Sequence, residues 1–473
     1  MAEYVMTVGL EVHIELKTET KIFCSCPVEF GAPPNSNICP VCMGLPGALP
    51  SLNRRVVEYA IKAGSALNCS INKLSFMDRK NYFYPDLPKA YQISQYDTPL
   101  CENGHLDVEC DGKNVRIGIT RIHIEEDAGK LIHTEGGETL IDCNRCGTPL
   151  IEIVSDPDIH SSEEAKAYLK ALRAVILTTG ISDCRMNEGS MRCDVNISVA
   201  PEDSPIRGQR TEIKNINSFS FVGKAIEAEY RRQIEVLKCG GTIERETRRY
   251  NASTGKTESM RSKESVEDYR FFREPDIIPI HVSAEEIGKL KSSIPPLPAE
   301  RKKLYVEEIN LPEYDAALLS SDITLSDIFD SSAKLTEHKK ALANLLLGEI
   351  LRLCDSEEFY CPIPAKSLAE LSDMFGNGDI NSSTQKKLVA RLWDDPTLSP
   401  RHIAESESLW QIKDEERLLP LVLEAIEKNQ RSAVDYKNGK TNALKALVGY
   451  VMGKTGGLAE PKTVEKLLLE RIK

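Results

Sequence analysis

Apolar and polar residues alternate in four short stretches of the chain, at residues 10–15, 121–125, 193–198 and 210–214. A period of two is typical of a half-buried strand, whose successive side chains point to opposite faces of a sheet. The polar positions include groups that bind metal ions, namely Glu11, His13, Glu15, His123, Glu125, Asp194, Asn196 and Glu212. We therefore predict a sheet with a strongly acidic polar face.

Helical periodicity interrupts these strands in two places. Residues 53–67 carry an apolar stripe at helical spacing, and residues 161–179 begin with a Ser-Ser-Glu-Glu cap and end before Gly180. Strands followed by isolated helices, without strict strand–helix alternation, are typical of an α+β domain with a mainly antiparallel sheet. We predict such a domain for residues 1–293.

The pattern changes after a linker-like Ser-Ser-Ile-Pro-Pro-Leu-Pro segment at residues 292–298. Almost everything beyond it has helical periodicity, and a second break at residues 394–400 precedes a last helical unit. We predict an all-helical domain at 294–405 and a small helical tail domain at 406–473. The clearest predicted helices of the middle domain are 299–308, 332–354, 364–375 and 382–393.

Composition is that of an ordinary globular protein, since 41% of the 473 residues are hydrophobic and 28% are charged. There is no run of about 18 apolar residues to cross a membrane, and the N-terminus does not resemble a signal peptide. The 14 cysteines are therefore expected to be reduced thiols of a cytoplasmic protein.

Charge is unevenly distributed along the chain, whose net charge is −12. From Arg417 to the end there are 11 Lys or Arg against 6 Asp or Glu. A basic tail on an acidic protein favours contact with nucleic acid. The alternative interpretation is an ordinary, mildly basic helical domain.

The carboxylates of the polar face suit magnesium, which prefers oxygen ligands and is often bound by phosphate oxygens as well. More acids are present than one ion needs, which favours two metal positions of the kind found at phosphoryl-transfer sites. His13 and His123 are expected beside such ions, as ligands or as their neighbours. The alternative interpretation is a solvated strand face with cross-strand ion pairs.

Four cysteines are spaced as two close pairs, Cys24 with Cys26 and Cys39 with Cys42. This spacing, in a proline-rich segment with little regular structure, predicts a closed tetrathiolate zinc site of structural rather than catalytic role. The alternative is free or redox-active thiols. A further C-x-x-C pair, Cys143 and Cys146, has no second pair nearby and is interpreted as two incidental thiols.

Nucleotide binding by a P-loop is excluded by the sequence. Both Gly-Lys-Thr triplets, at 255–257 and 453–455, lack the required upstream glycine, because Tyr250 and Val448 stand there. Residues 78–86 are instead rich in cations and aromatics. Lys80 and the nearby Lys89 are candidates to bind phosphate or carboxylate, and Tyr82 is a candidate hydrogen-bond donor. A turn with aromatics packed beneath it is the alternative.

Six segments of the chain, in order, resemble the B subunits of the tRNA-dependent aspartyl/glutamyl amidotransferases, the GatB family. They are residues 8–13, 78–86, 89–95, 121–129, 147–152 and 246–249. The resemblance extends over essentially the whole chain, including a tail similar to the YqeY-type domain. It implies an N-terminal cradle domain with a glutamine synthetase-like sheet.

The resemblance also implies an activity. Proteins of this family activate the side-chain carboxylate of Glu or Asp on misacylated tRNA with ATP, as an acyl phosphate that ammonia then displaces. The implied magnesium ligands are Glu11, His13, Glu125 and Glu126, with Asp194 and Glu212 as weaker candidates. The implied catalytic residues are Glu11, His13, Glu125, Glu126 and Lys80, and the implied cofactor-binding residues are Lys89, Tyr82 and Arg248.

The resemblance implies partners because nothing in the chain looks like a glutaminase. A separate A subunit of the amidase family would supply ammonia through a channel, and a small C subunit would complete a heterotrimer. Lys80, Lys89 and Tyr82 would lie along this channel or beside the phosphate. Some proteins of the family lack the cysteine quartet, so zinc would serve as scaffold. Two rival functions are a non-catalytic tRNA-binding scaffold and a free-standing ligase for a small carboxylate.

Overall fold

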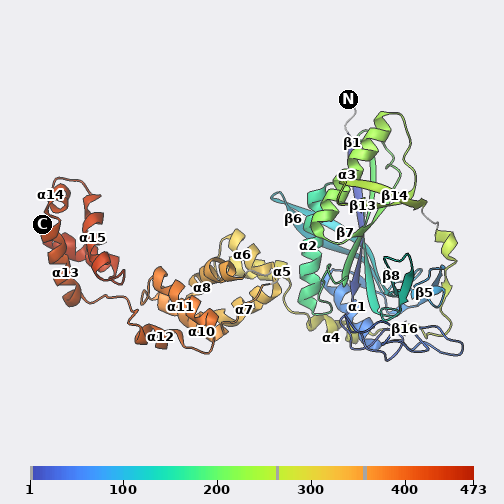
Figure 1. The fold of residues 1–473 in the computed structure, drawn as a ribbon, viewed down its shortest axis with the longest axis horizontal. Helices are drawn as coiled ribbons and strands as arrows, with labels where there is room; N and C mark the ends of the chain where they lie inside the picture. The colour runs from blue at the N-terminus through green and yellow to red at the C-terminus, as the bar shows by residue number, and fades with distance from the viewer. Residues whose placement is uncertain (1–3, 263–265, 355–358, 473) are drawn as a thin grey trace. The chain divides into compact units, whose positions relative to one another are not determined.

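The computed structural model describes residues 4–262, 266–354 and 359–472, and the chain divides into two compact units, Met1–Leu297 and Pro298–Lys473. The first unit is built on a sheet and the second on helices (Figure 1). The predicted domain limits at 293/294 and 405/406 stay a prediction. The second unit has two separate hydrophobic clusters, one within residues 305–404 and one within 418–472.

The central sheet of the first unit has nine strands in the order β14-β13-β12-β11-β1-β10-β7-β6-β2. Neighbouring strands are antiparallel except for β12 and β13, which are parallel. The prediction of an α+β fold with a mainly antiparallel sheet is therefore confirmed. The strands are β1 (Tyr4–Glu15), β2 (Ser70–Ile71), β6 (Cys101–Cys110), β7 (Lys113–Glu126), β10 (Pro149–Ser155), β11 (Met191–Pro201), β12 (Thr211–Ile216), β13 (Glu246–Asn251) and β14 (Lys256–Ser262).

Three smaller sheets stand beside the central one. The sheet with the order β15-β4-β5 is the most relevant to function, because β5 contacts β7 and β4 carries Lys80. Its strands are β4 (Asp78–Asn81), β5 (Tyr91–Ser94) and β15 (Phe272–Arg273); the other two sheets pair β3 (Leu74–Ser75) with β16 (Ile280–His281), and β8 (Lys130–His133) with β9 (Thr139–Asp142).

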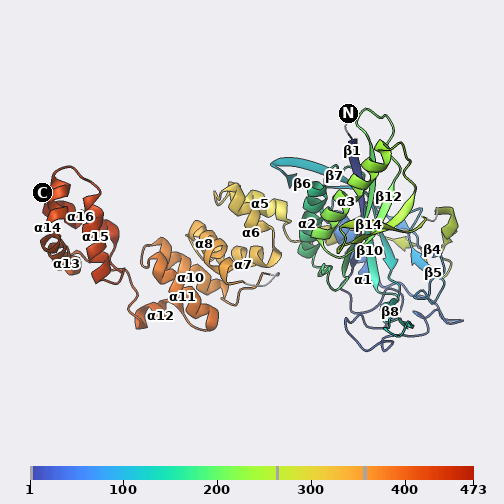
Figure 2. The ribbon, with the colours of Figure 1, turned by 45° about the horizontal axis from the view of Figure 1, so that its top comes forward.

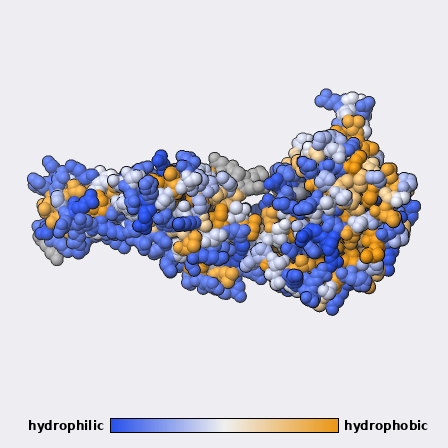
Figure 3. Space-filling model, turned by 90° about the horizontal axis from the view of Figure 1, so that it is seen from below, coloured by the Kyte–Doolittle hydropathy of each residue, from blue (hydrophilic) through white to orange (hydrophobic). Residues whose placement is uncertain are grey.

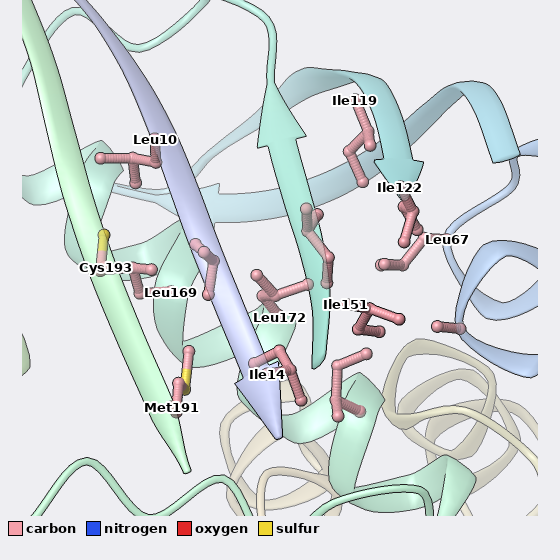
Figure 4. Packing of buried hydrophobic residues seen from close by; sticks show 14 of the residues in the cluster. Leu10, Ile14, Leu67, Ile119, Ile122, Ile151, Leu169, Leu172, Met191 and Cys193 are labelled. Carbon is pink, nitrogen blue, oxygen red and sulfur yellow. The ribbon is translucent and has the colours of Figure 1, made fainter. Parts of the chain in front are cut away.

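The apolar face of the central sheet is covered by the helices α1 (Arg54–Ala66), α2 (Ser162–Thr179) and α3 (Phe219–Lys238), as Figures 1 and 2 show. The predicted period of two is confirmed in β1, where every second residue from Met6 to Ile14 is buried. In Figure 4, Leu10 and Ile14 lie among the side chains that pack with Leu169 and Leu172 of α2. This packing leaves the other face of β1 to its polar residues.

Helix α3 is absent from the sequence prediction, which gave only two helices to this part of the chain. It is preceded by Ser218, whose side chain accepts a hydrogen bond from the backbone N–H of Phe221. Its buried side includes the polar residues Glu229 and Gln233, which interrupt the apolar stripe that would have revealed it. The unit also contains the short helices η1 (Val266–Tyr269) and α4 (Ala284–Ser292).

The second unit is helical, as predicted. The predicted helix 332–354 is wrong as a single element, because α7 ends at Ala333 and the next helix begins only at Lys339. The helices are α5 (Pro298–Glu307), α6 (Glu313–Ser320), α7 (Ile323–Ala333), α8 (Lys339–Leu345), the π-helix η2 (Leu346–Ile350), α9 (Leu351–Leu353), α10 (Ala365–Gly376), α11 (Ser382–Asp394), α12 (Pro400–Ser406), α13 (Glu415–Lys428), α14 (Gln430–Lys437), α15 (Ala443–Lys454) and α16 (Pro461–Ile472).

The surface of the helical unit is largely hydrophilic on the face that Figure 3 shows, as expected for amphipathic helices that bury one side. Within the described residues, no helix combines the length and the apolar character needed to cross a bilayer.

Candidate active site

The polar face of the central sheet gathers acids from five adjacent strands, β12, β11, β1, β10 and β7. Strand register brings residues from distant parts of the chain opposite one another: Glu11 faces Asp194, and His13 faces Glu152. Residues directly opposite in an antiparallel pair share a face and lie close enough to interact. The acids therefore form two groups on one face.

The first acid group consists of His13, Glu125 and Glu152, each of which offers a ligand atom within 4.8 Å of the others. The His13 Nε2 atom lies 3.8 Å from a Glu125 oxygen. A second histidine, His123, places its Nε2 atom 3.2 Å from a Glu152 oxygen. The Nδ1 atoms of both histidines are buried and have no hydrogen-bond partner among the described residues.

The carboxylates of Glu125 and Glu152 lie close together in a buried place, which shifts their pKa values. Burial, and secondarily the Glu152 carboxylate, raises the pKa of Glu125 to about 7. Burial also works to raise the pKa of Glu152, but His123, then His13 and Lys80, outweigh it and hold that pKa below its usual value. A divalent cation would relieve this repulsion, so the group has the chemistry of a metal site.

The second acid group consists of Glu11, Asp194 and Glu212, whose ligand atoms also lie within 4.8 Å of one another. Two neutral donors orient it: Asn196 donates to a Glu11 oxygen at 2.9 Å, and Thr247 donates to a Glu212 oxygen at 2.8 Å. Because Glu11 and His13 are two residues apart on β1, the two groups adjoin, about 7 Å apart along the strand.

A lysine ammonium already lies in the second acid group. The Lys214 Nζ atom is 2.6 Å from an Asp194 oxygen and 3.6 Å from a Glu212 oxygen. Burial would lower the pKa of Lys214, but the carboxylates of Asp194 and Glu212 more than offset it and raise that pKa above its usual value. Lys214 therefore remains charged.

Lys80 and Tyr82 lie beside the first acid group, and their predicted catalytic and cofactor-binding roles stay predictions. The Lys80 Nζ atom stands 4.7 Å from the ring centre of Tyr269 and 5.7 Å from that of Tyr82. Its charge lowers the pKa of both Glu125 and Glu152, after the larger effects described above. Burial first, and then Glu125, raises the pKa of the Tyr82 hydroxyl.

Glu126, a predicted metal ligand, is not brought together with the two acid groups. Glu126 directly follows Glu125 on strand β7, so its side chain projects to the opposite face of the sheet. Its carboxylate is buried, forms an ion pair with Lys89, and accepts a hydrogen bond from the backbone N–H of Ile93 at 2.9 Å. Lys89, predicted to bind cofactor, is thus engaged with Glu126.

Arg248, also predicted to bind cofactor, lies on the helix-covered side of the sheet. Its neighbour Thr247 contacts Glu212 on the acid face, so Arg248 points the other way. Its guanidinium donates to the carbonyl oxygen of Thr257 at 2.7 Å, lies 3.4 Å from a Glu229 oxygen and forms an ion pair with Glu246. These contacts join β13 to β14 and to α3.

Sequence reasoning missed Glu152 and Lys214 as site residues. The signal for Glu152 was present, because it stands between Ile151 and Ile153 in the same alternating pattern as the other strands. Lys214 follows Glu212 at a spacing of two, which puts it on the same face. Only the strand order shows that both side chains join the acid groups.

The four predicted zinc ligands do come together. Cys24, Cys26, Cys39 and Cys42 each place a sulfur within 4.8 Å of the others. The hydrogen bond with Cys24 is the main cause that lowers the pKa of Cys42 to about 5, against the effect of burial. Four converging thiols, one of them readily ionised, fit a tetrahedral zinc ion.

The chain is similar to known proteins over nearly its whole length. Residues 6–288 match the family model described as the GatB/GatE catalytic domain, and residues 327–472 match that described as the GatB domain. The B subunit of the aspartyl/glutamyl-tRNA(Asn/Gln) amidotransferase of Caldicellulosiruptor saccharolyticus is 49% identical over 477 residues, covering 99% of both chains. The proteins of the same name from Thermoanaerobacter pseudethanolicus and Clostridium tetani are 48% and 47% identical, with 99% of both chains covered in each case.

Proposed function

The chain belongs to the family of aspartyl/glutamyl-tRNA(Asn/Gln) amidotransferase B subunits, and on this premise we propose that it amidates the side chain of Glu-tRNA(Gln), Asp-tRNA(Asn) or both. The observation that carries the proposal is the pair of adjoining acid groups on one face of the sheet. ATP activation of a carboxylate needs concentrated positive charge, and these acids are suited to hold it.

The reaction has two steps. An oxygen of the tRNA-borne carboxylate attacks the γ-phosphorus of ATP, the bond to ADP breaks, and an acyl phosphate forms. Ammonia then attacks the carbonyl carbon, inorganic phosphate leaves, and the nitrogen loses a proton to give the amide. The first step brings two anions together, so its rate depends on the charge that the site presents.

Each acid group would hold one magnesium ion. His13, Glu125 and Glu152 would form the first site, and the second acid group would form the other; when bound, magnesium supplies charge that neutralises the phosphate oxygens. Lys80 stands beside the first group and offers its ammonium to a transferring phosphate or carboxylate. We omit Glu126 from the metal ligands because its carboxylate is paired with Lys89. We omit Arg248 from the cofactor-binding residues because it lies beside Glu229 on the helix-covered side of the sheet.

Ammonia would come from partner proteins, an amidase-family A subunit with a small C subunit. We place Lys89 and Glu126 in the wall of its path, because both line a cavity of about 170 Å³ together with Phe23, Tyr91 and Gly147. The tail helices α14–α16, which carry seven Lys or Arg against three Asp or Glu, would contact the tRNA sugar–phosphate backbone.

The test of the function is reconstitution. The chain, supplied with its A and C partners, Glu-tRNA(Gln), glutamine, ATP and magnesium, should produce Gln-tRNA(Gln). If no amide forms with either misacylated tRNA, the proposed function is wrong. Turnover of a small free carboxylate without tRNA would favour the free-standing ligase instead.

Metal binding to the first acid group should strengthen as pH rises to about 7 and level off above it. Below its pKa of about 7, Glu125 retains a proton that the metal must displace, so affinity should rise by up to about tenfold per pH unit. Manganese titrations between about pH 5.5 and about pH 8 check this. Glu125→Gln should weaken manganese binding at every pH and lose the rise in affinity towards pH 7, and a flat wild-type profile would contradict the assignment.

The cysteine quartet is proposed as a structural zinc site. Purified protein should contain about one zinc per chain, and replacing Cys39 and Cys42 with Ser should remove it and lower the melting temperature of the first unit. Metal analysis measures the zinc content, and thermal unfolding measures the melting temperature. Cys239→Ser, at an exposed position outside the quartet, is the control and should retain the metal. A metal-free protein with an unchanged melting temperature would refute the site.

A further inference from the structure

Lys214 stands at the solvent side of the second acid group. Its side chain is 36% exposed, whereas those of Asp194 and Glu212 are only 17% and 7% exposed. The ammonium contacts both carboxylates, and the Glu11 carboxylate also acts on its charge. A cation is therefore already bound where the second metal ion would be held.

The position of Lys214 follows from the strand geometry. Glu212 and Lys214 are two residues apart on β12 and project to the same face. A register shift in the pairing of β11 with β12, between Cys193 and Val195, lies at Asp194, and such bulges redirect side chains. The lysine carries its charge on a flexible four-carbon stem, so it can leave this place without a change in the strand.

The first acid group differs in this respect. Among the described residues, no lysine or arginine nitrogen lies within 4 Å of Glu125 or Glu152, whose ion-pair partners are the histidines His13 and His123. Lys80 lies nearby over aromatic rings instead. A metal ion entering the first group therefore has no such nitrogen to displace, whereas one entering the second group must displace the Lys214 ammonium.

We propose that Lys214 is an internal counter-cation that makes binding of the second metal ion depend on the nucleotide. An ammonium and a divalent ion repel each other too strongly to share three carboxylates in contact. Lys214 must therefore move when the metal enters, and the phosphate groups of the nucleotide are the anions that receive it. The inference rests on the proposed metal–nucleotide function and adds an order of assembly to it: metal and nucleotide fill the second group together.

The experiment is a manganese titration followed by electron paramagnetic resonance, with and without a non-hydrolysable ATP analogue. In the wild-type chain, the analogue should raise the affinity for the second manganese ion by at least about tenfold. In Lys214→Met without the analogue, the second ion should bind at least about tenfold more tightly than in the wild type, because no internal cation competes. Lys214→Arg keeps the charge and should behave as the wild type.

Further variants test whether the manganese ion that binds more tightly in Lys214→Met lies in the second acid group. Adding Glu212→Gln to Lys214→Met should abolish the gain, while Lys170→Met, an exposed lysine on α2, should change nothing. Lys214→Gln replaces Lys214→Met if the latter does not fold. The inference is overturned if the neutral variants bind the second ion no more tightly than the wild type, or if the analogue does not affect wild-type affinity. Formation of acyl phosphate by the wild-type heterotrimer is measured in parallel, so the proposed function can stand while this inference fails.

Discussion

Replacing Glu125 with Gln is expected to reduce acyl-phosphate formation by about two to three orders of magnitude and to leave tRNA affinity unchanged. The substitution keeps the shape of the side chain and removes the charge at the centre of the first acid group. Glu125 is the acid whose carboxylate lies 3.8 Å from His13 and within 4.8 Å of Glu152, so its loss weakens the hold of the first acid group on a divalent ion. The tRNA would be held mainly by the tail, far along the chain from this change.

The measurement uses the reconstituted heterotrimer with Glu-tRNA(Gln), and follows ADP release and amide formation separately from tRNA binding on filters. Glu138→Gln, at an exposed position near the β8–β9 turn, removes one carboxylate without touching the acid face and should retain full activity. A Glu125→Gln enzyme within about tenfold of the wild type would contradict a metal role for this residue. It would instead favour the scaffold interpretation, in which the acids take no part in catalysis.

The local part of this site could be predicted from the sequence. A period of two depends only on neighbouring residues. The sequence therefore predicts the strands that contain Glu11, Glu125, Asp194 and Glu212, and it predicts which residues of each strand lie on the polar face. The cysteine quartet was evident for the same reason, since its spacing is short. The family resemblance added that these segments act together.

The non-local part could not be predicted. Which acids meet depends on the order β12-β11-β1-β10-β7, which joins strands separated by more than a hundred residues in places. That order divides the acids into two groups, adds Glu152 and Lys214, and excludes Glu126, whose phase was overlooked because it follows Glu125 directly. It also turns Arg248 away from the acid face, towards a helix that the sequence did not reveal.

The sequence pattern did not predict helix α3 because its buried side carries a polar network. The Glu229 side chain is fully buried and accepts hydrogen bonds from Gln233 at 2.8 Å and from the Thr257 hydroxyl at 2.6 Å. Arg232 forms an ion pair with it, and Arg248 lies 3.4 Å away. One carboxylate thus ties α3 to β14 at the edge of the sheet and to its neighbour β13, where an apolar stripe would otherwise be expected.

Replacing Glu229 with Ala is therefore expected to destabilise the first unit by about 3–5 kcal/mol, because it leaves the largely buried Arg248 short of a counter-charge and Thr257 without its acceptor. Both tryptophans, Trp393 and Trp410, belong to the second unit, so unfolding of the first unit should appear in far-ultraviolet circular dichroism but not in tryptophan fluorescence. Glu235→Ala, at an exposed position of the same helix, is the matched control and should change stability by less than about 0.5 kcal/mol. Equal, small effects of the two substitutions would show that the network contributes little, because only a buried carboxylate with fixed partners carries the larger cost.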